Sequence, residues 1–282
     1  METGEANRPS GAGPEVTVLG AGTLIPDDDR RSAAHWVEAG GVRLLVDCGS
    51  GALHGTARYG LRWSQVSHIA LTHFHTDHVG DLAPFLWALR HGSRPPRQQP
   101  LVLLGPPGTK SFLHRLAGAF GDFVIDPPFP LEVVELPRRG AWTSSDGLLH
   151  LESHPTPHTE ESVAYRIELG GAAVGFTGDT GPSEDLGRFF AGVSLLLAEC
   201  SLSDPTDLDN HLSPSTLAAL ARAAEPELLL VTHCYPEVPR SELPDLLQSL
   251  GYTGACAVAV DGMRTRVTRN SAELRGGFPT RE

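Results

Sequence analysis

The stretch ALTHFHTDHVGD, residues 70–81, decides how this chain is interpreted. An apolar predicted strand runs directly into four polar side chains, His73, His75, Asp77 and His78. Because side chains two apart on a strand point to the same side, His73 and His75 can bind one cation. The chain then turns, so that Asp77 and His78 can face a second cation. Imidazole and carboxylate groups suit zinc, with manganese or iron as alternatives.

Three later segments place further polar side chains at the ends of predicted strands. HPTPH (154–158) precedes one strand, GFTGDTG (175–181) places Asp179 after another, and LLLVTHCYP (228–236) ends a third at His233. An aspartate flanked by glycines can bridge two cations through its two oxygens. Four ligands cannot complete two catalytic sites. The later segments therefore predict that the chain assembles a binuclear metal centre.

Short apolar, β-branched runs between Gly, Pro and Asp turns predict many strands and few helices. The predicted strands span 16–20, 35–39, 42–47, 68–72, 101–104, 131–136, 162–169, 172–176, 193–199 and 227–233. The predicted helices span 78–90, 109–120, 213–224 and 241–250, and glycine pairs at 40–41 and 170–171 predict hairpins. This pattern favours two packed sheets with helices outside them.

No internal repeat and no linker divides the 282 residues. We therefore expect one domain over residues 15–269, preceded by a disordered lead at 1–14 and followed by a loose tail at 270–282. No window reaches the roughly 18 uninterrupted apolar residues that a membrane span needs. The first residues also lack the pattern of a secretory signal. These features predict a cytoplasmic protein that has no contact with a membrane.

Charge and cysteine usage narrow the function classes further. The formal net charge is −12, whereas proteins that bind nucleic acid usually present a basic surface. Stable binding of nucleic acid is therefore not expected, although a small phosphate ester remains a suitable substrate. The four cysteines are widely separated and form no CxxC pair. Free thiols in a reducing cytoplasm are their simplest interpretation.

The order of these motifs resembles one known family. HxHxDH, a lone His, an Asp in a TGDT turn and a terminal His resemble the metallo-β-lactamase superfamily, and within it the ribonuclease Z-like and phosphodiesterase-like branch. The likeness extends from VTVLGAGTLIP near the start to VTHCYP near the end. It implies an α/β fold, a four-layered αββα sandwich, and two divalent metal ions, with zinc ahead of manganese or iron.

The resemblance also assigns ligands. It places His73, His75 and His158 on the first metal, Asp77, His78 and His233 on the second, and Asp179 between them. His158 is preferred as the third ligand because PHTEESVAYRI resembles the family's His before a Ser-x-x-Tyr strand. His154 and His150 remain alternatives for this position.

Three residues receive catalytic roles from the same resemblance. His211, in NHLSPSTLAALARAA, resembles a histidine of this branch that precedes a helix, and Glu199 resembles the acidic residue that orients it. A protonated imidazole there would stabilise phosphoryl charge or protonate the leaving oxygen. Asp77 would orient or deprotonate the attacking water. The alternatives are that His211 only caps a helix and that Glu199 forms a surface salt bridge.

These expectations point to a metal-dependent hydrolase. The leading hypothesis is a phosphodiesterase that acts on a small or cyclic phosphodiester, with a small-molecule ester as its partner and a homodimer as a plausible assembly. Hydrolysis of a carboxylic or sulfuric ester, lactone or thioester is the alternative on the same metal centre. Transfer RNA 3′ processing ranks lower, because only 20 residues lie between His158 and Asp179, where ribonuclease Z carries its long arm. A non-catalytic metal-binding protein ranks lowest.

Overall fold

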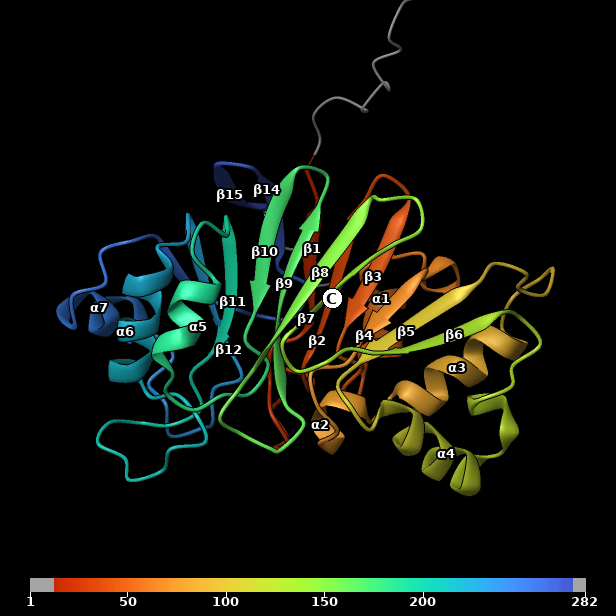
Figure 1. Ribbon diagram of the computed structural model, residues 1–282. Coiled ribbons are helices and arrows are strands. Elements are labelled where there is room, and N and C mark those ends of the chain that lie inside the picture. The colour runs from red at the N-terminus through yellow and green to blue at the C-terminus, as the bar shows by residue number, and fades with distance from the viewer. Residues whose placement is uncertain (1–12, 276–282) are drawn as a thin grey trace, which may run out of the picture.

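The computed structural model describes residues 13–275, and two β-sheets stacked face to face form its centre (Figure 1). The first sheet has the order β15-β14-β1-β2-β3-β4-β5-β6 and the second has the order β13-β12-β11-β10-β9-β8-β7. The first contains β1 (Glu15–Gly20), β2 (Ala34–Ala39), β3 (Val42–Val46), β4 (His68–Ala70), β5 (Leu101–Gly105), β6 (Leu131–Glu135), β14 (Arg264–Thr268) and β15 (Ser271–Arg275). The second contains β7 (Gly140–Thr143), β8 (Leu149–Pro155), β9 (Val163–Leu169), β10 (Ala172–Phe176), β11 (Leu195–Glu199), β12 (Leu228–Thr232) and β13 (Cys256–Val258).

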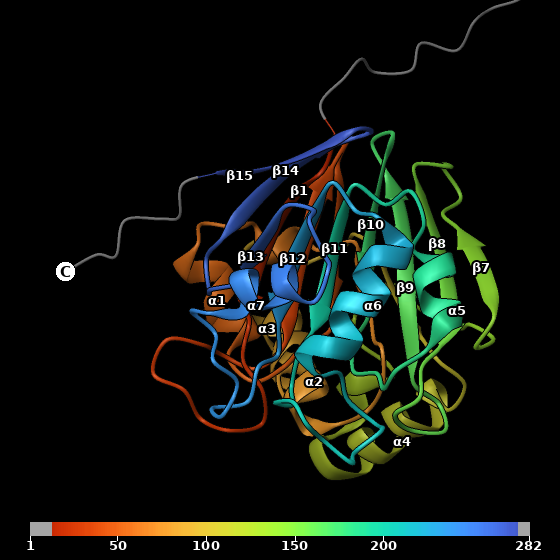
Figure 2. The ribbon, with the colours of Figure 1, turned by 90° about the vertical axis from the view of Figure 1, so that its left-hand side faces the viewer.

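Helices cover the outer face of each sheet (Figures 1 and 2). On the first sheet lie α1 (Ala52–Arg58), α3 (Leu82–His91) and α4 (Thr109–Phe120), and on the second lie α5 (Glu184–Phe189), α6 (Pro214–Ala224) and α7 (Leu243–Ser249). The short α2 (Thr76–Val79) and the 3-10 turns η1 (Trp63–Gln65) and η2 (Asp122–Val124) complete the described elements. The predicted four-layered αββα sandwich is confirmed.

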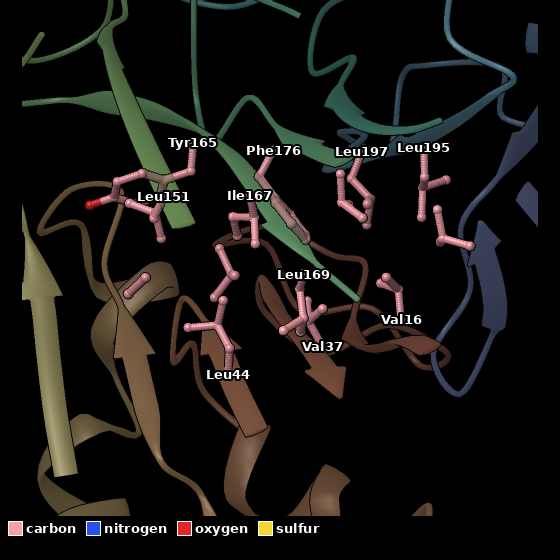
Figure 3. Close-up of a cluster of buried hydrophobic side chains, with 14 of the residues drawn as sticks. Val16, Val37, Leu44, Leu151, Tyr165, Ile167, Leu169, Phe176, Leu195 and Leu197 are labelled. Atoms are coloured by element: carbon pink, nitrogen blue, oxygen red, sulfur yellow. The ribbon is translucent and has the colours of Figure 1, made fainter. Parts of the chain in front are cut away.

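Alternation along the strands explains this layering. Val37 and Leu44 belong to the buried cluster between the two sheets, where Figure 3 shows them opposite residues of the second sheet. Their neighbours Trp36 and Leu45 belong to the cluster beneath the helices of the first sheet. Successive side chains on a strand point to opposite faces. A strand of continuous apolar residues can therefore fill both layers at once.

Several elements differ from the sequence predictions, among them β7, β8, β13, β14, α1 and α5, which were not predicted, and two of the differences have a clear physical cause. The helix predicted over residues 78–90 is divided into α2 and α3, because Gly80 lies against the Ser50 side chain and Asp81 accepts hydrogen bonds from the backbone of Gly51 and Leu53. In the tail predicted to be loose over residues 270–282, residues 271–275 instead form β15, which pairs antiparallel with β14, and residues 276–282 lie outside the described residues.

The described residues begin at Gly13, so most of the disordered lead predicted for residues 1–14 lies outside them. Pro14 is buried, and its carbonyl accepts a hydrogen bond from the backbone of Val267. The domain therefore starts two residues earlier than expected. Within residues 13–275, no helix has the length and apolar character that crossing a membrane requires.

Candidate metal centre

The predicted site residues gather at one edge of the two sheets. The strands β10, β11 and β12 run parallel, so their carboxyl ends lie at the same edge. Asp179 and His233 follow β10 and β12, and α2 lies at the corresponding end of the first sheet in Figure 1. β4 ends at Ala70, so His73 and His75 project from the loop after the strand rather than from the strand itself.

The first set of side chains, here called the outer group, combines His73, His75, His158 and Asp179. His158 Nε2 lies 3.0 Å from His75 Nδ1 and 3.6 Å from Asp179 Oδ2. His73 Nε2 lies 3.8 Å from the same carboxylate oxygen. His73 is buried, whereas His75 is exposed to solvent. The outer group is therefore the part of the centre that a substrate can reach.

The second set, here called the deep group, combines Asp77, His78 and His233, all of them buried. His233 Nε2 lies 3.2 Å from Asp77 Oδ2. The other carboxylate oxygen of Asp179, Oδ1, lies 3.2 Å from His78 Nε2 and 3.5 Å from His233 Nε2. Asp179 thus presents Oδ2 to the outer group and Oδ1 to the deep group, which is the arrangement of a bridging ligand.

Three buried atoms show that these groups fit cations. His73 Nε2, His78 Nε2 and Asp179 Oδ1 have no hydrogen-bond partner among the described residues, although buried polar atoms are normally satisfied. Ligands that are each about 2 Å from one tetrahedral ion lie about 3.3 Å apart. The distances within both groups are close to this value. Nitrogen and carboxylate donors in such numbers suit zinc.

The local electrostatics favour positive charge at the centre. Burial and the neighbouring His78 hold the pKa of His73 well below its usual value, so the imidazole is neutral and its lone pair is available. Burial opposes ionisation of Asp179, yet His233 and His78 hold the pKa of this carboxyl well below its usual range. Burial also opposes a charge on His78, but Asp179 and Asp47 outweigh it and raise its pKa. A cation would satisfy the same carboxylates.

A second layer of contacts orients the deep group, and sequence reasoning missed it. Asp47 lies 2.7 Å from His78 Nδ1 and also accepts hydrogen bonds from Thr72. Ser201 lies 3.0 Å from His233 Nδ1. Such contacts fix the ring orientation of metal-binding histidines. Asp47 and His233 both have positive φ, 56° and 54°, and this sparsely populated conformation is typical of functional sites.

His211 and Glu199 form a buried pair beside both groups. His211 Nδ1 lies 2.9 Å from Glu199 Oε1, and its ring centroid is 4.7 Å from that of His158. Glu199 is fully buried and also accepts hydrogen bonds from the backbone of Thr180 and Leu212. Although burial opposes a charge on His211, the carboxylate of Glu199 raises its pKa above the usual value. The alternative of a surface salt bridge for Glu199 is wrong.

The two rival histidines lie elsewhere. His154 Nε2 accepts a hydrogen bond from Arg139 at 2.6 Å, and its ring packs against Phe189 of α5. His150 Nδ1 lies 2.8 Å from the Thr143 hydroxyl on the neighbouring strand. Of the three candidates for the third position, the structure therefore brings His158 to the centre. Its Nδ1 lies 2.9 Å from a backbone carbonyl, that of Asn210.

Comparison with known proteins agrees with this geometry. Residues 42–234 match the family described as "Beta-lactamase superfamily domain". The chain is 33% identical over 248 residues to a protein named Ribonuclease Z from Mycobacterium bovis (strain BCG / Pasteur 1173P2), which covers 79% of this chain and 87% of that relative.

Solved structures show the same fold at lower identity. The metallo-β-lactamase fold protein YhfI from Bacillus subtilis matches with a TM-score of 0.77 and 22% identity, over 89% of this chain and 98% of that chain. Human tRNase Z, short form, matches with a TM-score of 0.71 and 21% identity, over the same shares of the two chains. The chain belongs to the metallo-β-lactamase superfamily of metal-dependent hydrolases and, within it, to the ribonuclease Z-like branch.

Proposed function

We propose that this protein is a phosphodiesterase that hydrolyses a small phosphodiester, such as a cyclic or nucleotide diester. The observation that carries the proposal is the position of His211, whose ligating atom lies within 4.8 Å of those of Asp179 and His233. Its Nδ1 is engaged by Glu199, so Nε2 is the nitrogen available to a substrate. A histidine in this place is outside both groups and is free to act on the substrate itself.

The residues divide the chemistry between them. The outer and deep groups would hold two divalent ions, which would lower the pKa of a bound water and neutralise charge on the phosphoryl oxygens. Asp77 presents Oδ2 to the deep group, 3.2 Å from His233 Nε2, and its other carboxylate oxygen would orient the attacking water. His211, kept protonated by Glu199, donates a proton from Nε2 to the departing alkoxide oxygen.

His211 favours a phosphodiester over a lactone. A pentacoordinate phosphoryl group carries more negative charge than the tetrahedral intermediate of a carboxylic ester. A fixed imidazolium stabilises the larger charge more strongly.

Cleavage of a transfer RNA 3′ trailer is the second candidate, favoured by the relatives named ribonuclease Z. The structure favours a smaller substrate, because the chain between His158 and Asp179 contains only the β9–β10 hairpin. The net charge of −12 also favours a small substrate, because an acidic protein repels a long polyanion such as transfer RNA.

A substrate panel tests the proposal. The purified zinc-, manganese- and iron-loaded forms are assayed with bis(p-nitrophenyl) phosphate, with p-nitrophenyl acetate, with a lactone and with a precursor transfer RNA. We expect turnover of the phosphodiester to exceed that of the carboxylic esters, and to fall in His211→Ala because the positive charge beside the phosphoryl oxygens is removed. Lactone or ester turnover without phosphodiester cleavage would overturn the proposal. Specific cleavage of the precursor RNA alone would establish the second candidate instead.

A further inference from the structure

A cavity of about 620 Å³ opens directly beside the outer group. It is lined by aromatic and charged side chains that can bind part of the substrate. His75 of the outer group and Phe74 form one part of its wall, and the start of α4 forms another. Two arginines and two glutamates complete it, Arg115, Arg138, Glu160 and Glu161. We call this cavity the Phe74 groove. Its volume lies within the roughly 300–1,000 Å³ typical of small-molecule sites.

Phe74 provides an aromatic surface held in a fixed position. Its ring stacks on that of Phe112 from α4, with centroids 4.7 Å apart and planes inclined by 13°. Phe112 therefore supports one face of the ring, while Phe74 remains half-buried and lines the groove. A planar ligand can stack on such a surface, as nucleobases do on aromatic side chains.

Two arginines in the groove are available to an anion. Arg115 donates a hydrogen bond to the Ser111 hydroxyl one turn earlier in α4, at 3.0 Å, and Arg138 Nη2 lies 3.5 Å from the Thr156 carbonyl. Within residues 13–275, neither guanidinium forms an ion pair with a carboxylate. The adjacent Arg139, by contrast, pairs with Asp185 at 3.2 Å. Guanidinium groups match the geometry of phosphate oxygens.

The helix end in the groove is not an alternative anion site. The backbone N–H groups of Gly108 and Lys110, at the start of α4, both donate to the carboxylate of Glu135, at 3.1 and 2.8 Å. A phosphate in the groove must therefore be met by the arginines. Glu160 and Glu161 would repel a phosphate. Their carboxylates instead accept hydrogen bonds from hydroxyl or amino groups of a ligand.

The groove thus offers an aromatic surface, two guanidinium groups and two carboxylates. A nucleotide has the matching groups, which are a planar base, a phosphate and hydroxyl or amino donors. We propose that the Phe74 groove binds a nucleotide unit of the substrate, with its base stacked on Phe74 and phosphate oxygens against Arg115 and Arg138. Its sugar hydroxyl or base amino groups face Glu160 and Glu161. This inference rests on the proposed function and deepens it, because it makes the scissile phosphodiester part of a nucleotide. A simple alkyl diester would leave the aromatic surface unused, and a lactone would also leave both arginines unused.

Two substrates with the same leaving group test the groove. They are the p-nitrophenyl ester of adenosine 5′-monophosphate and methyl p-nitrophenyl phosphate, which differ only in the nucleoside. We expect kcat/KM for the nucleotide ester to exceed that for the methyl ester at least about tenfold, the size of one base-stacking contact. Phe74→Leu should lower this ratio about tenfold, because only the nucleotide ester has a base. Arg115→Gln should lower kcat/KM for both substrates and leave their ratio unchanged, because both carry the phosphate that this residue contacts.

Matched controls separate the groove from the metal centre. Lys110→Gln removes a positive charge from the same helix at an exposed residue outside the groove lining, and it should leave the ratio unchanged. Metal content is measured in every variant, because Phe74 lies between two residues of the outer group. Arg115→Gln, which is remote from that group in sequence, keeps the test valid if Phe74→Leu loses metal. Its kcat/KM for each substrate should fall below that of Lys110→Gln, and equal values in these two variants would count against the groove.

The outcomes distinguish the two proposals. If both substrates are hydrolysed with equal kcat/KM and Phe74→Leu leaves the ratio unchanged, the groove proposal is wrong and the phosphodiesterase proposal stands. If neither is hydrolysed, the proposed function fails, and calorimetric titration still tests the groove. Adenosine 5′-monophosphate should bind at least about tenfold more tightly than inorganic phosphate, and less tightly to Arg115→Gln. Equal dissociation constants for the two would overturn the inference.

Discussion

The deep group and the outer group of the candidate metal centre share Asp179 but differ in how the protein holds them. In the deep group, His78 and His233 are buried, and each is oriented through Nδ1 by a buried side chain, Asp47 or Ser201. In the outer group, His75 is exposed and borders the Phe74 groove.

This difference indicates that the deep group and the outer group have different roles. The deep group is fixed by Asp47, which follows β3 of the first sheet, and by Ser201, which follows β11 of the second, and its side chains are buried. In the outer group His75 is exposed, so a substrate can reach the centre from this side. We therefore expect changes in the deep group to act through metal binding, and changes near the outer group to act through catalysis and substrate choice.

Removing Asp179, which both groups share, should affect the two groups at once. We expect Asp179→Ala to weaken binding in both groups and to reduce kcat more than any other single change described here. The loss should exceed the roughly 10²–10⁴-fold effect expected from removing a proton donor. Metal content after dialysis and kcat with bis(p-nitrophenyl) phosphate measure it. A variant that retains two ions and full turnover would show that the aspartate does not bridge.

His211→Ala separates catalysis from metal binding. His211 lies outside both groups, so we expect kcat to fall by about 10²–10⁴ while metal content stays unchanged. The matched control is His154→Ala, which removes a buried histidine of β8 that contacts Arg139 rather than the centre. Loss of metal together with activity would assign His211 to the centre as a ligand and would contradict its role as a proton donor.

Asp47→Asn sharpens the difference between the two groups. It removes the charge that faces His78 Nδ1 while keeping the shape of the side chain. We expect metal affinity to fall by about 10–100-fold, with the ion of the deep group released first. Asp185→Asn, an exposed carboxylate far from the centre in the fold, is the control. Equal weakening of both ions would show that the deep group has no separate support.

The pH dependence gives the smallest effect. Burial opposes the charged form of His211, yet Glu199 outweighs it and raises the pKa above the usual value. The protonated, active form is therefore present below that raised pKa and is lost as the pH rises through it. We expect kcat to decline on the basic side of its pH profile, and this decline to disappear in His211→Ala. An unchanged basic limb in the variant would assign it to another group.

The residue types at the centre could be predicted from sequence because most of them follow a short apolar run predicted as a strand, and because their order along the chain resembles one known family. The exact span of α4, residues 109–120, could also be predicted from its helical periodicity. Asp47 was missed because an aspartate after VRLLV reads equally well as a turn residue. Only the fold shows that Asp47 faces His78, 31 positions along the chain.

The remaining errors have physical causes of the same kind. β15 consists of SAELR, a largely exposed strand that is held by backbone pairing with β14 and has no clear apolar pattern. The break between α2 and α3 depends on the close approach of Gly80 to Ser50, a tertiary contact that local periodicity does not encode. The Phe74 groove likewise assembles residues from distant segments, so no single motif could indicate it.

The central claim is that two groups of side chains hold two ions around one aspartate. Metal analysis of the purified chain after equilibration with zinc tests it most directly, with His233→Ala as the companion variant. We expect two ions per wild-type chain and one in the variant, because the outer group contains no atom of His233. A wild-type chain that binds one ion or none would contradict the account.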